Sequence, residues 1–462
     1  MKFGKTFFVL AAWLCASQLF AAGVFDARAF GGKGDGKTKD TAAIQAAIDA
    51  AAKAGGGVAV IDSGVWLSGT IWLRSNVSLE IRRGATLLGS PDKADYNPDD
   101  FCSQQKVLKD EKVSNAHLII ALEVENVGIF GGGTICGNGI AFWESNPANR
   151  NAKPDQRFQF PEWRPSQMLF FCECRNVKLS DLELLDPPYW SDVFLGCDGV
   201  MLSRLTIKND HRGHNNDGID LDACSNVVVS DCIIDTEDDC IAIRSQGEHL
   251  KNKASVCENI AISNCVLSTR RCNAFRIGVG KGAIRNCVIS NVVVTDTRTG
   301  LCFLNTYKRR DGVSIENMKF SNVIIDAQNP IAMYTDNISW GRGEGNSFIR
   351  GISFSNCSFR GTRTNLIGGD LNHNISDIDF VGCEFTAVGG DLIDDNAPYT
   401  ELTEWGVKAV PSAFVVANAE NVRFLGCRFR WENITKKWDS AIEFVNCRNI
   451  AAPLPSETPA CP

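Results

Sequence analysis

The dominant feature of the chain is a regular alternation of apolar and polar residues, which begins near Val58 and continues almost to the C-terminus. Turn-forming Gly, Ser, Asn and Asp residues separate the short alternating segments. One pattern recurs, with about 23 to 34 residues between most neighbours, and this spacing is typical of a solenoid in which each repeat forms one coil. Its copies are NVKLSDLEL from Asn176, GVMLSRLTI from Gly199, NVVVSDCII from Asn226, NIAISNCVL from Asn259, NMKFSNVII from Asn317, GISFSNCSF from Gly351 and NVRFLGCRF from Asn421.

We therefore predict an all-β fold, a single-stranded right-handed parallel β-helix (solenoid) with an N-terminal capping α-helix. Alternate apolar residues would point inward, and the Ser-Asn or Ser-Asp step would turn the corner. The right hand follows from the general preference of parallel crossovers. Residues 41–54 show helical spacing, with Asp40 as the expected N-cap and Gly55 to Gly57 beyond the end. This helix would cover the open end of the first coil. Its apolar face is Ile44, Ala47, Ile48 and Ala51.

Three segments are expected along the chain. Residues 1–22 resemble a signal peptide, because Lys2 and Lys5 precede an apolar run and small residues follow at Ala21 and Ala22. Residues 23–450 form the β-helix domain, and residues 451–462 form a C-terminal tail. Because no other apolar run is long enough, we expect no membrane span and a secreted or periplasmic protein.

Charge and composition restrict the partners. The 462-residue chain is 44% hydrophobic, so it can bury a large core, and its net charge is -7. A negative chain has no overall attraction to nucleic acid, so no nucleic-acid partner is expected. We expect a monomer.

The chain has nineteen cysteines, a number that suggests disulfides in an exported protein. Several, however, follow an apolar strand in one recurring context, which favours small buried residues stacked coil on coil. We predict a mostly reduced ladder for this group and a few disulfides elsewhere. No cysteine and histidine cluster suits zinc, so no metal and no cofactor are expected. The ladder cysteines are Cys232, Cys265, Cys357, Cys383, Cys427 and Cys447.

The candidate chemistry lies in one stretch, residues 214–245, where two acidic turns each lead into an apolar strand. Superposing the strands aligns Ile219 with Ile241, and this register places Asp217 opposite Asp239 and Asn216 opposite Asp238. Stacked coils would then bring three acids, Asp217, Asp238 and Asp239, into one patch. Repelling carboxylates are costly as mere structure, so this patch predicts a functional site.

Three such acids suit glycoside hydrolysis with inversion. That reaction needs a protonated carboxyl to donate to the leaving oxygen and a carboxylate to activate water. We assign Asp238 as the acid, because its acidic neighbours would raise its pKa. Asp217 and Asp239 would hold and deprotonate the water.

The chain resembles the polygalacturonase family, glycoside hydrolase family 28, over nearly its whole mature length. The matching segments are VFDARAFGGKGDGKTKDTAAIQAAIDAA, GTIWLRSNVSLEIRRGATLLGS, FGGGTICGNG and LELLDPPYW. The resemblance implies a pectin-lyase-like right-handed parallel β-helix that cleaves pectic polysaccharides by inversion. The family's Asn-Thr-Asp motif falls on Asn215-Asn216-Asp217 and its Asp-Asp motif on Asp238-Asp239, which implies the same catalytic roles.

The chain departs from the family at two motifs. The Gly-His-Gly motif should fall near Cys272 and Asn273, where there is no histidine, and the Arg-Ile-Lys motif falls on Cys302, Phe303 and Leu304. In the family these basic residues resemble a clamp for the galacturonate carboxylate. We therefore expect plain polygalacturonate not to be the substrate.

Candidate replacements follow from the register. Extending it places Arg276 outward on the catalytic sheet, with Arg244 outward one coil earlier, while His211 and His214 precede the first acid. The expected substrate-binding residues are Asn215, His214, Arg244 and Arg276. Lys308, Arg309 and Arg310 are more typical of a solvated turn.

The leading hypothesis is an exported inverting glycosidase that acts on a pectic or related polysaccharide or on its oligosaccharides. One alternative is a polysaccharide lyase on the same architecture, with Arg244 or Arg276 as the base. Another is a non-catalytic carbohydrate-binding solenoid, because two of the four family motifs are altered. Retention of all three acids favours the hydrolase.

Overall fold

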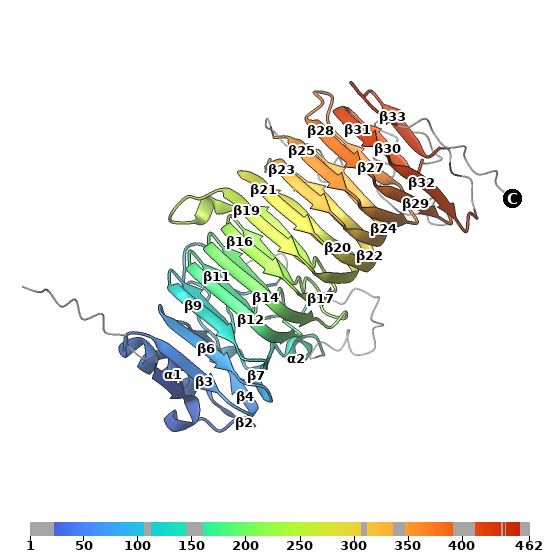
Figure 1. Ribbon diagram of the computed structural model, residues 1–462. Coiled ribbons are helices and arrows are strands. Elements are labelled where there is room, and N and C mark those ends of the chain that lie inside the picture. Colours follow the sequence, from blue (N-terminus) through green and yellow to red (C-terminus); the bar gives the residue numbers. More distant parts are fainter. Residues whose placement is uncertain are drawn as a thin grey trace, which may run out of the picture.

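The computed structural model describes residues 23–105, 112–144, 160–305, 312–335, 347–390, 412–435, 438 and 440–452. In these residues, 33 strands pair in parallel and stack into a right-handed β-helix (Figure 1). The column runs from α1 at the N-terminal end to β33 at the C-terminal end. The predicted fold class is confirmed.

Each coil crosses three faces. The first face carries β1 Gly23–Asp26, β3 Gly57–Ile61, β6 Val77–Ile81, β9 Glu125–Phe130, β12 Arg175–Leu185, β14 Asp198–Lys208, β16 Ser225–Ser230, β19 Val256–Ser263, β21 Ala283–Ser290, β23 Ser314–Ser321, β25 Ile349–Ser355, β28 Ile375–Val381 and β31 Ala419–Leu425. The second face carries the later halves of β12 and β14 and also β2 Asp35–Lys39, β4 Gly64–Ser68, β7 Ala85–Gly89, β10 Thr134–Cys136, β17 Ile233–Thr236, β20 Val266–Gly280, β22 Val293–Leu304, β24 Ile324–Tyr334, β26 Ser358–Gly361, β29 Glu384–Val388 and β32 Arg428–Glu432. The third face carries the later parts of β20, β22 and β24 and also β5 Ile71–Trp72, β8 Ile119–Leu122, β11 Leu169–Cys172, β13 Asp192–Leu195, β15 Ile219–Asp222, β18 Ile241–Ser245, β27 Asn365–Gly368, β30 Phe414–Ala417 and β33 Ile442–Val445.

Alternation along each strand separates core from surface. In β16, Val227 and Val229 are buried whereas Val228 between them is 40% exposed. The inward side chains stack along the axis and form one continuous core. Toward the C-terminal end this core contains a stack of aromatic rings with centroids 4.7 to 4.9 Å apart, formed by Phe320, Phe354, Phe380 and Phe424.

The corners are turned by Asn and Asp residues with positive φ, as the Ser-Asn and Ser-Asp steps predicted. Asp231 has a φ of 58° and Asn264 has a φ of 57°, a region that these short polar side chains tolerate. Their side chains bond from coil to coil, since Asn264 donates to Asp231 at 3.1 Å and Asn322 donates to Asn291 at 3.2 Å. The polar ladder therefore lines the outside of the corner.

The capping helix α1 spans Thr41–Lys53, as predicted, and its four predicted apolar residues are fully buried. Asp40 occupies the N-cap position but makes no side-chain bond to the helix. Its carboxylate instead accepts hydrogen bonds from the backbone N–H groups of Lys33 and Gly34, at 2.7 and 2.9 Å. Asp40 is thus the N-cap residue, as expected, but its carboxylate binds the preceding loop rather than the helix. The remaining helices are α2 Gly139–Glu144 and the 3₁₀ turns Ala27–Phe30, Lys93–Asp95 and Gly247–His249.

Every cysteine in the part of the chain that the structure describes is a free thiol, so the expectation of a few disulfides is not met there. The thiols of Cys232 and Cys265 interact, as do those of Cys357 and Cys383. Cys447 does not belong to this row, because it aligns with Ala419 at a different corner. That second corner carries its own row, which consists of Cys174, Cys197, Cys224 and Cys257.

The expected signal peptide, residues 1–22, and most of the tail, residues 453–462, lie outside the described residues, as do Lys308, Arg309 and Arg310. No helix in the described parts is both long and apolar enough to span a bilayer.

Candidate active site

The strands around the acids adopt the predicted register. Ile219 of β15 pairs with Ile241 of β18, and Ile241 in turn pairs with Phe275 of β20. The turns before these strands stack as well, since the N–H of Gly218 donates to the carbonyl of Asp239 at 2.8 Å. Asp217 and Asp239 therefore occupy equivalent positions on adjacent coils.

Arg244 of β18 holds the carboxylates together. Its Nε lies 2.8 Å from Asp220, and its Nη2 lies 3.1 Å from Asp217 and 3.9 Å from Asp239. The ring of Trp190 packs against this guanidinium, with its centroid 4.4 Å from Cζ. Burial lowers the pKa of Arg244, but the surrounding carboxylates outweigh burial and raise it above its usual value. The arginine therefore stays charged.

The crowding of the carboxylates also raises their pKa values and favours their protonated forms. Burial, followed by the charges of Asp238, Asp220 and Asp239, raises the pKa of Asp217 well above its usual value, against the lowering effect of Arg244. Burial and then Asp239 raise the pKa of Asp238, while the thiol of Cys272 lowers it. The cluster therefore favours keeping a proton at a pH where a free aspartate has lost its own.

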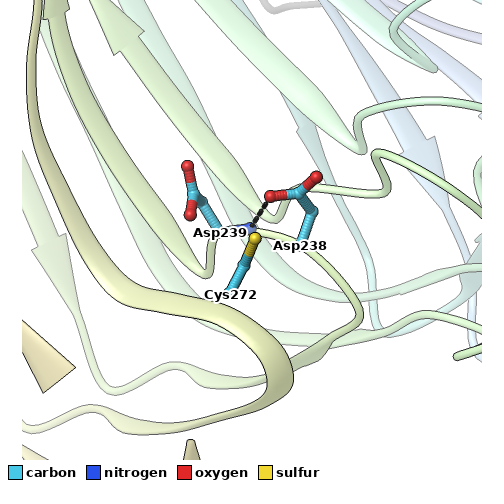
Figure 2. Close-up of side chains that lie close together, drawn as sticks. All are labelled: Asp238, Asp239 and Cys272. Carbon is cyan, nitrogen blue, oxygen red and sulfur yellow. Dashed lines mark hydrogen bonds between the residues drawn. The ribbon is translucent and has the colours of Figure 1, made fainter. Parts of the chain in front are cut away.

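Figure 2 shows Asp238, Asp239 and Cys272 side by side, with the N–H of Asp239 donating to Oδ1 of Asp238. That bond is 3.0 Å long, and Nδ2 of Asn215 lies 3.5 Å from the other oxygen of Asp238. Asp239 is held separately, because Nδ2 of Asn273 donates to its Oδ1 at 2.6 Å. Neighbouring carboxyls thus have different partners, as a division of chemical roles requires.

Among the residues that the structure describes, Asp238, Asp239 and Cys272 form one group whose ligand atoms lie within 4.8 Å of one another. Two carboxylates and one thiol lack the histidine and cysteine set of a closed zinc site. The absence of a metal cofactor stays a prediction.

The Asn-Asn-Asp turn is supported by Arg164, which the sequence did not single out. Its Nη1 donates to the carbonyl of His214 at 2.7 Å, and its Nη2 donates to Oδ1 of Asn215 at 3.1 Å. The imidazole of His214 is buried and lies 5.6 Å from the Trp143 ring and 5.1 Å from the Phe160 ring, centroid to centroid. The other candidate imidazole, His211, lies 3.1 Å from Asp235.

Sequence reasoning also missed three buried acids. Asp220 and Asp222 point outward from β15, and burial raises the pKa of Asp220 to about 7 and that of Asp222 to about 6. The sequence Ile-Asp-Leu-Asp could have predicted this pair, because every second residue of a strand faces the same side and the two aspartates alternate with core residues. Asp192 is different, because it pairs with Ile219 in the inward row and is 0% exposed.

Comparison with known proteins now decides the family. The family model for glycosyl hydrolases family 28 matches residues 87–375, which is more than half of the chain. The chain belongs to this family. A probable polygalacturonase from Vitis vinifera is 30% identical over 223 residues, which are 47% of this chain and 43% of that protein. An exo-poly-alpha-D-galacturonosidase from Dickeya chrysanthemi is 28% identical over 255 residues, 46% of this chain and 40% of that protein. The matches therefore span less than half of these two relatives.

Comparison with solved structures supports the fold. An exopolygalacturonase from Thermotoga maritima superposes with a TM-score of 0.65 at 22% identity, covering 79% of this chain and 87% of that one. A parallel β-helix is therefore common to this chain and to a solved exopolygalacturonase.

The family 28 chain lacks the usual basic residues at the expected places. Cys302 is aligned with Arg276 on the outward row and is followed by the inward Phe303. The match of Cys302, Phe303 and Leu304 to the family's Arg-Ile-Lys motif stays a prediction. Arg276 stands one coil earlier, with its Nη1 3.9 Å from the sulfur of Cys302. Cys272 takes the place near which the family's histidine was expected.

Proposed function

We propose that the protein is an O-glycosyl hydrolase that cleaves a pectic or related polysaccharide, or its oligosaccharides, with inversion. The observation that carries the proposal is the patch of buried Asp217 and Asp239 and half-buried Asp238 around Arg244. Membership of family 28 and likeness to polygalacturonases support it.

The roles follow from the contacts of each acid. Asp238 is the proton donor, because burial and Asp239 raise its pKa and so favour its protonated form. Asp217 and Asp239 both lie near Arg244, whose charge stabilises a carboxylate, and they position and deprotonate the water. Asn215, which lies beside Asp238, and His214 contribute to substrate binding.

We infer that plain polygalacturonate is not the preferred substrate. Cys302 and Leu304 cannot bind a carboxylate by charge, and Arg244 already faces three acids. Arg276 is the remaining basic group that the register places on the outward row beside the acids. The site therefore prefers either a neutral sugar at this position or an anionic sugar reached from the coil of Arg276.

A panel of pectic polysaccharides and oligosaccharides, assayed by release of reducing ends, tests the proposal. Hydrolysis of a member other than polygalacturonate, abolished in Asp238→Asn, is the expected result. Polygalacturonate as the best substrate would overturn the specificity. A product that absorbs in the ultraviolet would indicate elimination and overturn the hydrolase assignment.

Export and a monomeric state complete the proposal. The N-terminal signal motivates export, and mass spectrometry of the mature N-terminus from a secreting host tests it. Light scattering of the purified chain tests the monomer.

A further inference from the structure

An irregularity in β20 lies directly against the catalytic acids. Thr269 pairs with Thr297 of β22, whereas Asn273 pairs with Thr299, so three residues of β20 stand opposite one residue of β22. Such a bulge turns side chains toward a new side and is common beside active sites. Here the three bulged residues are 270–272, and the bulge re-aims residues 271–273 toward the acids.

Each re-aimed residue contacts one of three consecutive acids. Nε of Arg271 lies 3.6 Å from Oε1 of Glu237. The sulfur of Cys272 lies within 4.8 Å of the carboxylate oxygens of Asp238 and Asp239 (Figure 2). Residue by residue, the bulge and the acidic turn face each other in order.

The third contact is the tightest. Asn273 donates to Oδ1 of Asp239 through both its side chain, at 2.6 Å, and its N–H, at 3.2 Å. Two further hydrogen bonds involve backbone carbonyls. Oγ1 of Thr269 donates to the carbonyl of Glu237 at 3.1 Å, and the N–H of Cys240 donates to the carbonyl of Asn273 at 2.9 Å. Both ends of the acidic turn are thereby fixed to the bulge.

We propose that residues 271–273 form a positioning clamp for the acidic turn, and that Cys272 is the positioning residue that holds the proton donor Asp238. This inference rests on the proposed function for the role of Asp238, but the contact itself does not. A thiol at this place supplies a weak neutral donor. The group is uncharged because burial, followed by Asp238 and Asp239, raises the pKa of the Cys272 thiol well above its usual value.

The clamp sets the pH range of the reaction. A donor to the carboxylate form of Asp238 stabilises that form and lowers its pKa, as the thiol does here. A general acid works only while protonated, so activity is present below its pKa and is lost above it. Cys272 therefore moves the alkaline limit of activity to lower pH.

Two variants of similar volume separate the donor from the space it fills. Cys272→Val keeps the bulk but removes the donor, so the alkaline limb of kcat/KM should move up by about 0.5 to 1 pH unit. Cys272→Ser keeps a donor, so its limb should stay in place or move down. Cys136→Ala, on β10 and away from the acids, is the matched control. An unmoved limb in Cys272→Val, or equal shifts in both Cys272 variants, would overturn the clamp.

A second measurement needs no substrate. The extent of alkylation of Cys272 by iodoacetamide, measured by peptide mass spectrometry at a series of pH values, reports the ionisation of its thiol. In Asp238→Asn the repulsion from a neighbouring carboxylate is lost, so alkylation of Cys272 should begin at lower pH than in the unmodified sequence, while Cys136 should not change. Identical Cys272 profiles would refute the contact. If no polysaccharide is cleaved, the proposed function fails. The alkylation measurement still shows whether Cys272 contacts Asp238, because it needs no substrate.

Discussion

Arg276 and Cys302 lie on adjacent coils of the outward row, with Nη1 of the arginine 3.9 Å from the sulfur of the cysteine. If Cys302 occupies the place of the family's arginine, as the sequence predicts, then Arg276 offers a base one strand away. One strand corresponds to roughly 4.8 Å along the column, a shift comparable to the thickness of a sugar ring. We therefore expect Arg276 to be the residue that recognises an acidic group of the substrate.

Replacement of Arg276 by Ala should reduce kcat/KM on an anionic substrate by about 10- to 150-fold, because a charge-assisted hydrogen bond contributes about 1.5 to 3 kcal/mol. The salt dependence of kcat/KM should weaken in parallel. On a neutral substrate the change should be small. Initial rates at several salt concentrations measure both effects.

Arg276→Lys is the control, since it keeps the charge but loses the planar fork. It should retain more activity than Arg276→Ala on an anionic substrate and show the same salt dependence as the unmodified sequence. Equal losses in both variants, on neutral and anionic substrates alike, would show that Arg276 supports the fold rather than recognition.

Asp238→Asn should lower kcat by about 10²- to 10⁴-fold, the usual contribution of a general acid, because the amide has nearly the same shape but no acidic proton. Asp296→Asn is the matched control, since Asp296 is exposed and paired with Arg270. Neither variant should unfold at a lower temperature than the unmodified sequence in circular dichroism.

The stereochemistry follows from the same assignment. NMR of the first product should show an inverted anomeric centre, because water rather than a protein nucleophile attacks. A retained anomer would mean that one of the three carboxylates forms a covalent intermediate, and the roles of Asp217 and Asp239 would have to change.

Asp192 should make stability depend on pH. It lies in the inward row, and none of the residues that the structure describes donates a hydrogen bond to either of its carboxylate oxygens. Burial, followed by Asp220, raises its pKa well above the usual 3.8. The outward Asp220 and the inward Cys232 are the titratable neighbours that its charge affects. A raised carboxyl pKa gives stability that is complete below pH 3.8 and is lost as pH rises toward the folded-state pKa.

Asp192→Asn should therefore gain stability over the unmodified sequence as pH rises from 4 to 7, with little difference at pH 4. Asp192→Val, which matches its aliphatic neighbours in the row, should gain about 1 to 3 kcal/mol more by removing an unsatisfied polar group. Urea unfolding at each pH measures these differences. If the free energy of unfolding differs by the same amount between the unmodified sequence and Asp192→Asn at every pH, then Asp192 does not titrate in this range.

The cysteines in the described residues should all react as thiols. Alkylation in denaturant without a reductant, followed by peptide mapping, should label each of them, and dithiothreitol should not change the unfolding temperature. Any unlabelled pair that becomes labelled after reduction would identify a disulfide.

Some of this site follows from sequence because strands alternate with a period of two and coils repeat. That logic places Asp217 beside Asp239 and Arg276 on the outward row, and it extends to Asp220. The bulge at residues 270–272 escapes it, because a change of register depends on backbone geometry that no residue pattern marks. Cys447 was assigned to the wrong row for a similar reason, since two different corners share one local sequence context.

With all of its described cysteines free, the column has no covalent tie between one coil and the next. Its cohesion comes from ladders and stacked side chains. The helix α1 covers one end, and among the described strands the last one, β33, pairs only with β30. A molecule of this kind, stretched by its two ends in an optical trap, should peel from the C-terminal side. The force trace should show a series of small steps, each the length of one turn of chain, instead of a single rupture.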